Sequence, residues 1–226
     1  MIKILFEDNH IIVAEKPFGL LSQSDITGDP DILTELKAYI KNKYKKPGNV
    51  FVGLVHRLDK NVGGVMVFAK TSKAAARLSK QIQSHKFQKT YLAVVNGIVE
   101  NQEQTLKHYL VKSEEERRSI AYDSEVRDSK YAELAYKVLA TDSNYSLLEV
   151  ALKTGRAHQI RVQLSTIGHS IVGDKLYIEG IRDSNTPIAL WAYKLSFFHP
   201  VTQELVTFKA VPPTTNPWKN FNLCDV

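Results

Sequence analysis

The sequence predicts an α+β fold with a mixed, mostly antiparallel central sheet and flanking helices. Segments with the pattern of strands outnumber those with the pattern of helices, and a short polar turn at residues 142–144 joins two strands as in a hairpin. Repeated strand–helix–strand units are missing, which argues against a Rossmann or a barrel fold. With 226 residues, the chain fits one compact domain, and we expect residues 1–226 to form two halves that share one sheet.

The first fifty residues are expected to form a pair of strands and then a helix. Residues 2–15 cluster β-branched side chains around an Asp8-Asn9 turn, which is typical of two strands. Asp29-Pro30 predicts the start of a helix, because aspartate is a common N-cap and proline is tolerated in the first turn. Pro47-Gly48 is expected to end this helix.

A strand, a helix and a second strand are expected next. Residues 65–69 have the apolar pattern of a short buried strand. Thr71 or Ser72 is expected to cap the following helix, whose apolar residues recur at helical spacing. Residues 91–95 predict a strand that ends at the strong turn signal Asn96-Gly97.

The second half is expected to contain four strands and one helix. Two strands flank the hairpin turn, a helix follows, and two strands come before Pro212-Pro213; the expected ranges are 132–140, 145–152, about 158–167, 188–198 and 205–211.

The composition indicates a globular protein. Hydrophobic residues make up 43% and charged residues 24%, whereas a disordered chain is far poorer in apolar residues. No apolar run approaches the roughly 18 residues that a membrane span needs. Acidic residues follow the N-terminus too early for a signal peptide, so we expect a cytoplasmic protein. The single cysteine, Cys224, excludes an intramolecular disulfide and makes a cysteine-based metal site very unlikely.

The basic residues are unevenly distributed. The net charge is +6 and the pI about 9.2. Residues 60–99 and 150–173 contain no acidic residue, although they hold many lysines and arginines. Such segregation suits a face that binds a polyanion, because each cation near a phosphate releases counterions. Solvated helix faces that happen to lack acids are the alternative.

Several common catalytic and metal-binding motifs are absent. The chain has no phosphate-binding loop, no dinucleotide fingerprint and no Gly-x-Ser-x-Gly elbow. None of its seven histidines lies three or four residues from another, so a helix-based zinc site has no support.

The first segment that folding does not explain is residues 53–70. It places Arg57 and Asp59 just before a paired glycine and a buried strand. Residues two apart on an extended chain point the same way, so both side chains can face one cleft. A surface salt bridge at a turn, with Asp59 capping the loop, is the alternative interpretation.

The second such segment is residues 153–164. A strand ends there, a glycine turns the chain, and a helix begins with polar residues at its N-terminus, which suits an anion. His158 and Arg161 are expected to share a helix face opposite Ile160 and Leu164. A polar helix face in solvent is the alternative.

At these residues the sequence resembles the pseudouridine synthases of the RluA family. The resemblance spans almost the whole chain in five ordered blocks. The blocks lie at 15–19, at 56–59 with Gly64 and Ala69-Lys70, at 89–97, at 154–161 with Gly168-His169 and Gly173-Asp174, and at 190–200.

The sequence departs from the family pattern in three places. Val62-Gly63-Gly64 stands for the usual Thr-Ser-Gly, His169-Ser170 for His-Pro and Val162-Gln163-Leu164 for Val-His-Leu. We expect the additional glycine to loosen the loop that carries Asp59. The first block starts so early that no N-terminal S4-type RNA-binding domain is expected.

The resemblance implies the pseudouridine synthase catalytic fold and the isomerisation of specific uridines in structured RNA, either ribosomal or transfer RNA. No cofactor and no metal are implied. Asp59 would be the catalytic residue, as a nucleophile or as the base that deprotonates the ribose. Tyr91 would stack on the target base and lie near the later proton transfer, and Arg161 would pair with Asp59.

The resemblance also implies a set of substrate-binding residues. A base inside folded RNA must be flipped out, and Arg57 is placed to enter the vacated space. The basic segments 41–46 and 70–89 would hold phosphates. RNA is the expected partner, with neither a membrane nor an obligate protein partner. The expected binding residues are His56, Arg57, Lys89, Gly155, Arg156, His158, Gln159 and Leu190, the last lining the pocket.

Two other functions stay open from the sequence. One is a catalytically silent RNA-binding protein of the same fold, which the altered Val62-Gly63-Gly64 segment favours. The other is a nucleotide glycosidase that acts through Asp59.

Overall fold

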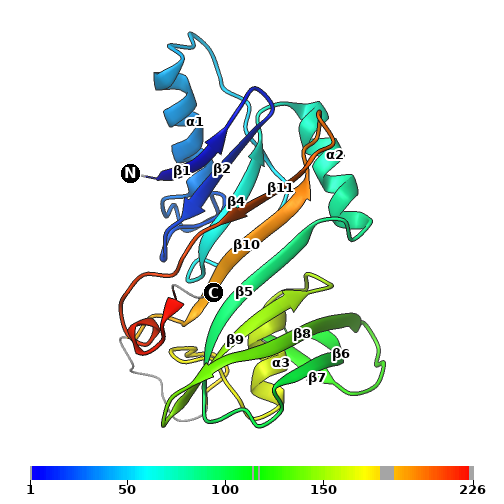
Figure 1. The fold of residues 1–226 in the computed structure, drawn as a ribbon. Coiled ribbons are helices and arrows are strands. Elements are labelled where there is room, and N and C mark those ends of the chain that lie inside the picture. The colour runs from blue at the N-terminus through cyan, green and yellow to red at the C-terminus, as the bar shows by residue number, and fades with distance from the viewer. Residues whose placement is uncertain (1, 114, 117, 179–185, 224–226) are drawn as a thin grey trace. The chain divides into compact units, whose positions relative to one another are not determined.

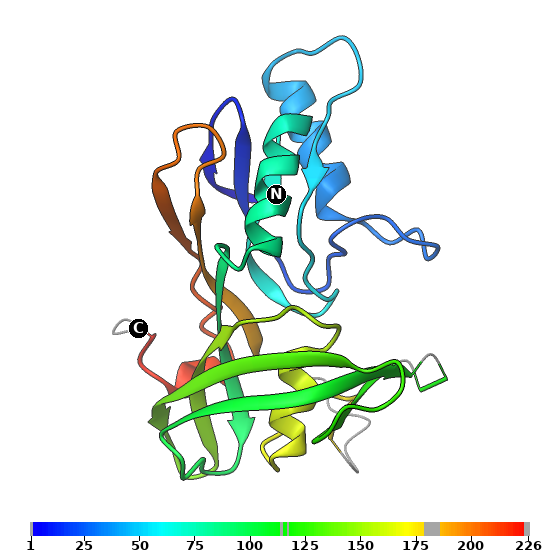
Figure 2. The same cartoon turned by 90° about the vertical axis from the view of Figure 1, so that its right-hand side faces the viewer.

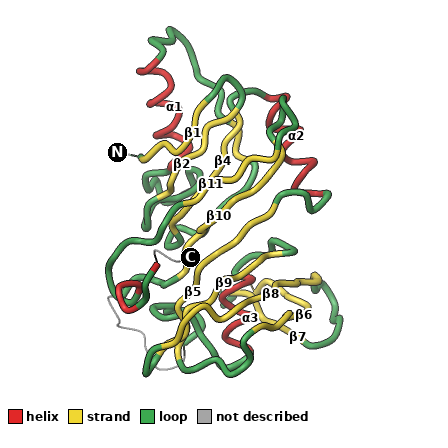
Figure 3. The backbone as a smooth tube through the Cα atoms, in the orientation of Figure 1, coloured by secondary structure: helices red, strands yellow, loops and turns green. Residues whose placement is uncertain are grey.

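The computed structural model describes residues 2–113, 115–116, 118–178 and 186–223. The chain divides into two compact units. The first unit comprises Met1–Gln88 and Ala192–Ala210, and the second comprises Lys89–Trp191 and Val211–Val226. Strands predominate over helices in both units (Figure 3), and the α+β class expected from the sequence is confirmed. One domain with a shared sheet stays a prediction.

The first unit consists of strands with two helices on one side of them (Figures 1 and 2). Its strands are hydrogen-bonded in the order β1-β2-β4-β10, with β3 beside β4 and β11 beside β10. The pairs β1–β2, β2–β4, β3–β4 and β10–β11 are antiparallel. The elements are β1 (Lys3–Glu7), β2 (Ile11–Lys16), α1 (Ile32–Lys43), β3 (Gly53–Leu54), β4 (Gly63–Ala69), α2 (Ser72–Gln83), most of β10 (Leu190–Phe198) and β11 (Leu205–Lys209).

The core of this unit explains why β2 and β4 have nearly continuous apolar sequences. Every residue of β4 is buried, as are the first four residues of β2, so neither strand has a solvent face. Val13 and Val67 from these strands pack in one cluster with Leu78 of α2 and Phe197 of β10.

The helix boundaries correct one prediction and settle another. Helix α1 begins after Asp31, not after Asp29, because the extended Asp31 accepts a hydrogen bond from the Thr34 N–H at 2.9 Å. The Asp29 carboxylate instead pairs with Lys60 at 2.5 Å. Thr71 is the N-cap of α2 and accepts from the Ala74 N–H at 3.1 Å.

A buried carboxylate anchors the end of α1. Glu7 accepts hydrogen bonds from Lys43 and Lys70, both at 2.7 Å, and from the hydroxyls of Tyr39 and Tyr44 at 3.2 and 3.0 Å. Burial alone would raise the pKa of Glu7, but the bonds from Lys43, Lys70 and Tyr44 outweigh it and lower the pKa to about 2. Lys43 and Lys70, expected to hold phosphates, are therefore committed to this anchor.

Among its described residues, the second unit has its own antiparallel strands and one α-helix (Figure 1). Its strands are hydrogen-bonded in the order β5-β9-β8-β6-β7. The elements are β5 (Gln88–Asn96), β6 (Glu103–Ser113), β7 (Arg118–Tyr122), β8 (Lys130–Thr141), β9 (Tyr145–Leu152), α3 (Gln159–Thr166) and a short 3-10 helix (Trp218–Asn220).

The second unit confirms the expected hairpin and adds two strands. Asp142 accepts from the N–H groups of Asn144 and Tyr145 at 2.7 and 2.8 Å, which closes the turn between β8 and β9. Strands β6 and β7, which the sequence did not predict, pair with each other, and β6 also pairs with β8. Helix α3 lies against this sheet and buries Ile160, Val162 and Leu164. Within the described residues, no helix has the length and apolar character of a membrane span.

The start of β4 depends on a glycine without a substitute. Gly64 has φ +124°, and a Cβ there would lie 2.2 Å from the Ala192 carbonyl oxygen of β10. Gly63 already belongs to β4 and is buried, and the Val62 N–H donates to the Asp59 carbonyl at 3.0 Å. The additional glycine therefore lies in a strand, which differs from the loosened loop that we expected.

Replacing Gly64 by alanine is expected to destabilise the protein by about 3 kcal/mol or more, because the methyl group meets backbone and the φ is strained. Urea unfolding followed by fluorescence measures the change. Gly48→Ala is the matched control, since nothing lies within 4 Å of its added Cβ, and it should change stability by less than about 0.5 kcal/mol. Equal losses of stability in the two variants would contradict the requirement for glycine at position 64.

Candidate active site

The loop between β3 and β4 presents Arg57 and Asp59 on the same side of the chain. Arg57 is exposed, Leu58 is buried and Asp59 is half-buried, which is the alternation expected of an extended segment. The loop is closed on itself by the hydrogen bond from Val62 to Asp59, and the Gly19 N–H donates to the Lys60 carbonyl at 3.0 Å. The Asp59 side chain thus stands on a loop whose backbone is fixed on both sides.

Two buried side chains, Ser22 and Lys16, hold this loop through hydrogen bonds to its backbone. The Ser22 hydroxyl donates to the Leu58 carbonyl at 2.7 Å and accepts from the Leu58 N–H at 3.0 Å. The Lys16 Nζ is completely buried and donates to the carbonyls of Lys60 at 3.0 Å, Leu20 at 2.5 Å and Pro17 at 3.1 Å. Every ammonium hydrogen of Lys16 therefore has an acceptor. Sequence reasoning missed both roles, although Lys16 lies in the first resembling block.

Lys16 is a buried cation beside the candidate catalytic carboxylate. Burial lowers the pKa of Lys16 to about 8, and the negative charge of Asp59 opposes this shift. The ammonium group that shapes the loop therefore also interacts electrostatically with the side chain of residue 59.

His56 fixes the same loop to β4. Its Nε2 atom accepts a hydrogen bond from the Val67 N–H at 3.1 Å, which places the ring proton on Nδ1 in the neutral form. The ring packs edge-on against Phe87, with centroids 5.5 Å apart. Contact between His56 and RNA stays a prediction; these two contacts give the residue a positioning role.

In the second unit, β5 places Lys89 and Tyr91 on one face of the strand, two residues apart. Tyr91 is buried, and burial lowers the pKa of Lys89. A Cβ on Gly155 would lie 3.1 Å from the Lys89 Nζ, so the missing side chain leaves room for the ammonium group. The structure thus brings together Lys89 and Gly155, which the sequence analysis named as separate binding residues.

Gln159 holds the turn that precedes α3. Its Oε1 accepts from the Thr154 hydroxyl at 2.8 Å and the Arg156 N–H at 2.9 Å, and its Nε2 donates to the Glu133 carbonyl at 3.0 Å. Gln159 is buried, whereas Arg156 is exposed and its Nε donates to the Tyr131 carbonyl at 2.9 Å. Gln159 therefore orders the turn, and its direct contact with RNA stays a prediction.

Arg161 projects from α3 into a bidentate pair with Asp174. Its Nε and Nη2 atoms donate to the two carboxylate oxygens of Asp174 at 2.7 and 2.8 Å. The Asp174 side chain is fully buried and also accepts from the Leu176 N–H at 3.0 Å. The guanidinium carbon lies 5.3 Å from the centre of the Tyr177 ring. Gly173-Asp174 was part of a resembling block, but neither Asp174 nor Tyr177 was assigned a role.

His158 and Arg161 both contact Tyr177, although His158 precedes α3 as its N-cap and does not lie on a face of the helix as we expected. The His158 Nδ1 lies 3.1 Å from the Tyr177 hydroxyl, which also accepts from the Ser119 N–H at 2.7 Å and donates to the Ser119 carbonyl at 3.2 Å. All these groups are satisfied when the His158 Nδ1 carries the proton. His158 itself has a left-handed backbone, with φ 53°, at the start of α3.

The candidate residues divide between the two units. Asp59, Arg57 and His56 belong to the first, and Tyr91, Arg161 and the residues around them to the second. Leu190 is buried at the start of β10, still within the second unit. Among the described residues, no three histidine, cysteine, aspartate or glutamate side chains gather as metal ligands would.

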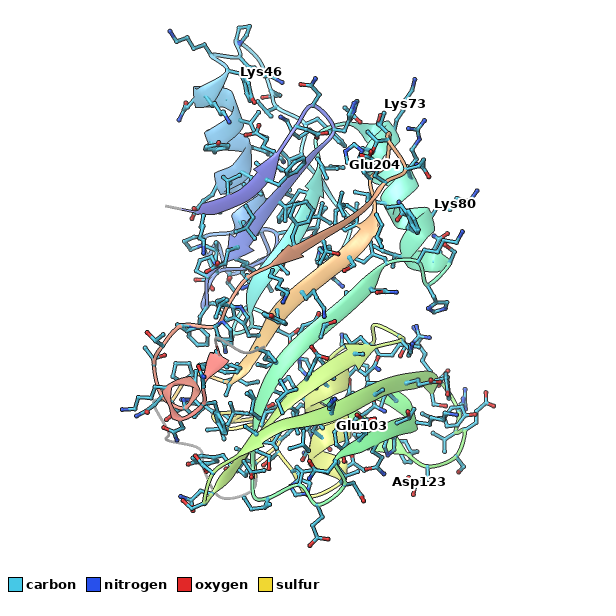
Figure 4. All side chains as sticks on the ribbon, in the orientation of Figure 1. Lys46, Lys73, Lys80, Glu103, Asp123 and Glu204 are labelled. Atoms are coloured by element: carbon cyan, nitrogen blue, oxygen red, sulfur yellow. The ribbon has the colours of Figure 1, made fainter. Side chains whose placement is uncertain are left out.

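The excess positive charge lies in the first unit. That unit contains sixteen lysines and arginines against nine aspartates and glutamates, whereas the second contains fourteen against fifteen. Helix α2 has no acidic residue, and Lys73, Arg77 and Lys80 recur on its exposed side. Figure 4 shows Lys73 and Lys80 pointing away from the helix. We call these three residues the α2 basic face.

Comparison with known proteins points to one family. The family model described as RNA pseudouridylate synthase matches residues 10–166. The chain is 35% identical over 215 residues to the uncharacterized RNA pseudouridine synthase YhcT of Bacillus subtilis, covering 93% of this chain and 68% of the relative. It is 34% identical over 222 residues to ribosomal large subunit pseudouridine synthase D of Zymomonas mobilis, covering 94% and 69%.

Solved structures share the fold. Human RNA pseudouridylate synthase domain containing 4 superposes with a TM-score of 0.78 at 22% identity, covering 93% of this chain and 88% of that one. Human RNA pseudouridylate synthase domain containing 1 gives a TM-score of 0.75 at 23% identity, covering 96% and 86%.

Neutralising Asp59 is expected to lower the pKa of Lys16 below its value of about 8, because the charge that opposes desolvation is removed. An NMR titration of the Lys16 side chain in Asp59→Asn measures this without any substrate. Glu15→Gln, which removes a carboxylate beside Lys16 in the sequence, should leave the titration midpoint in place. An unchanged midpoint in Asp59→Asn would show that the two groups do not interact.

Proposed function

The chain belongs to the RNA pseudouridylate synthase family, and on this premise we propose that Asp59 is the catalytic carboxylate for converting specific uridines of structured RNA to pseudouridine. The observation that carries the proposal is the presentation of Asp59. Its carboxylate is half-buried on a loop fixed by Lys16, Ser22 and Gly19, inside the segment that the family model matches. A reacting carboxylate needs this kind of fixed placement beside the sugar.

The reaction rearranges one nucleoside and consumes nothing. The bond between C1′ of the ribose and N1 of uracil breaks, the base turns, and C1′ bonds to C5. The proton on C5 leaves and N1 gains one, so atoms and electrons balance without a redox partner. Asp59 acts at the sugar, either by attacking C1′ or by removing a ribose proton.

Arg161 and Tyr91 complete the proposed site. Asp174 holds the Nε and Nη2 atoms of Arg161, and in this proposal, as the family resemblance implies, Arg161 is the cationic partner of the catalytic carboxylate. A guanidinium in that place orients the carboxylate through charge-assisted hydrogen bonds. The Tyr91 ring stacks on the uracil and lies near the proton transfer from C5, and Leu190 helps to keep water from the detached base.

The RNA is held through its backbone and opened at the target. The α2 basic face is exposed and free of acidic neighbours within the helix, which suits contacts to phosphates. Arg57 is exposed two residues before Asp59, and the buried Leu58 anchors the chain between them. The planar guanidinium of Arg57 stacks in the space that the flipped base has left.

Relatives support ribosomal RNA as the first substrate to test. The Zymomonas mobilis relative and one from Nitrosomonas europaea are both named ribosomal large subunit pseudouridine synthase D. We therefore propose uridines of large-subunit ribosomal RNA, with transfer RNA as the second class to assay.

Asp59→Asn is expected to abolish turnover while RNA affinity stays within about threefold, or about 0.6 kcal/mol, because the amide keeps the shape and loses the reactive oxygen. Release of tritium from RNA labelled at uridine C5 measures turnover, and filter binding measures affinity. Residual turnover near that of the wild type would remove Asp59 from its role.

The same assay separates the proposed reaction from its alternatives. Tritium release with the base still bonded to the ribose supports a synthase. Free uracil in the products would instead indicate a glycosidase, and RNA that is bound but unchanged would indicate a silent binding protein.

Arg57→Ala is expected to slow turnover about 10- to 100-fold on a folded RNA, because flipping then proceeds without the side chain that fills the gap. The loss should be smaller on an oligonucleotide whose target uridine is unpaired. Single-turnover rates on the two substrates measure the difference. Arg127→Ala is the control, since Arg127 is also exposed and pairs only loosely with Asp128 at 3.6 Å. Wild-type rates for Arg57→Ala on both substrates would refute this role.

A further inference from the structure

We infer that Tyr177 is a positioning residue that sets the orientation of the Arg161 guanidinium. The inference rests on the proposed function, in which Arg161 pairs with the catalytic carboxylate, and assigns a role to a side chain that touches neither Asp59 nor RNA in the proposal.

Tyr177 and Asp174 constrain Arg161 in different directions. The Asp174 carboxylate holds the Nε and Nη2 atoms in the plane of the guanidinium, with two bonds of 2.7 and 2.8 Å. Rotation of that plane about the axis of the pair is resisted by the Tyr177 ring, whose centre lies 5.3 Å from the guanidinium carbon. A carboxylate alone would fix one edge of the group, whereas the ring also limits how the guanidinium plane can tilt.

Tyr177 is itself held by β7. Only 8% of the residue is exposed, and its hydroxyl bonds to both the N–H and the carbonyl of Ser119. The Ser119 hydroxyl also donates to the Ala157 carbonyl at 2.7 Å, just before α3 begins. The aim of Arg161 therefore depends on the edge strand β7 as well as on its own helix.

The same hydroxyl supports a second candidate residue with a strained backbone. His158 is a non-glycine residue at φ 53° and caps α3 without a side-chain cap bond. Its imidazole instead contacts the Tyr177 hydroxyl at 3.1 Å, with the two rings nearly perpendicular at 89°. Strained residues persist where surrounding contacts determine them, and they concentrate at functional sites. Tyr177 thus holds His158 through its hydroxyl and Arg161 through its ring.

Two variants of Tyr177 separate the ring from the hydroxyl. Tyr177→Leu removes both and is expected to lower kcat about 30- to 100-fold, the scale of a misplaced catalytic group. Tyr177→Phe keeps the ring and should lower kcat only about 3- to 10-fold. RNA affinity should stay within about threefold in both.

Tyr136→Phe is the matched control. Tyr136 is also buried in the same unit, and its hydroxyl donates to the Gln104 side chain at 2.9 Å. Tyr136→Phe removes a tyrosine hydroxyl whose partner has no role in the proposed site, so its kcat should stay within about twofold of the wild type. A comparable loss of kcat in Tyr136→Phe would overturn the inference, because the effect would follow from stability alone.

An NMR measurement distinguishes failure of this inference from failure of the proposed function. The Nε–H signal of Arg161 should be protected from exchange in the wild type and in Tyr136→Phe, and weakened in Tyr177→Leu. An unaltered signal in Tyr177→Leu overturns the positioning role, whatever the activity. If the wild type makes no pseudouridine but the signal weakens as expected, the positioning holds and the proposed function fails. Should Tyr177→Leu not fold, Tyr177→Phe replaces it: a smaller weakening of the signal supports the positioning role, and an unaltered signal overturns it.

Discussion

The loop that carries Asp59 depends on a buried ammonium group. Lys16 is enclosed by protein, and a cation in such surroundings is tolerated only when its hydrogens are satisfied. Three backbone carbonyls from two segments meet this requirement, and one of them belongs to Lys60, next to Asp59. Because the Lys16 ammonium group needs these carbonyl acceptors, it determines the path of the backbone next to Asp59. Ser22 repeats this arrangement on a smaller scale, with one hydroxyl that serves both backbone groups of Leu58.

The second unit uses the same physical device around Arg161. The buried carboxylate of Asp174 pairs with the Arg161 guanidinium and also accepts from the Leu176 N–H, so both of its oxygens have a donor. The Tyr177 ring packs against the same guanidinium. Gln159 orders the preceding turn through three hydrogen bonds in the same manner. In both units, the groups proposed to act on RNA are thus held in place by buried side chains: Lys16 and Ser22 hold the Asp59 loop, and Asp174 holds Arg161. Polar networks of this kind favour one arrangement because partial satisfaction is costly.

Local patterns predicted what local forces determine. The fold class, the β8–β9 hairpin and the Thr71 cap follow from alternation, turn residues and capping, and the structure has them. The start of α1 was predicted two residues too early because a rule for N-caps cannot distinguish Asp29 from Asp31. In the structure Asp29 pairs with the distant Lys60, and Asp31 caps the helix. Resemblance directed attention to Asp59 and Arg161. It did not reveal Ser22 or Tyr177 as supports, because Leu58 and Ser119, to which they bond, lie far along the chain. It did not reveal Lys16 either, because a lysine is ordinarily expected at the surface.

The uneven charge of the two units has a consequence for how RNA first meets the protein. The net positive charge belongs to the first unit, while the second is close to neutral. Long-range attraction acts before any base is recognised and weakens as salt screens it. Under the proposed function, a folded RNA that diffuses toward the molecule is therefore attracted to the first unit more than to the second. This attraction would orient the encounter from the start and restrict the poses from which a uridine is sought.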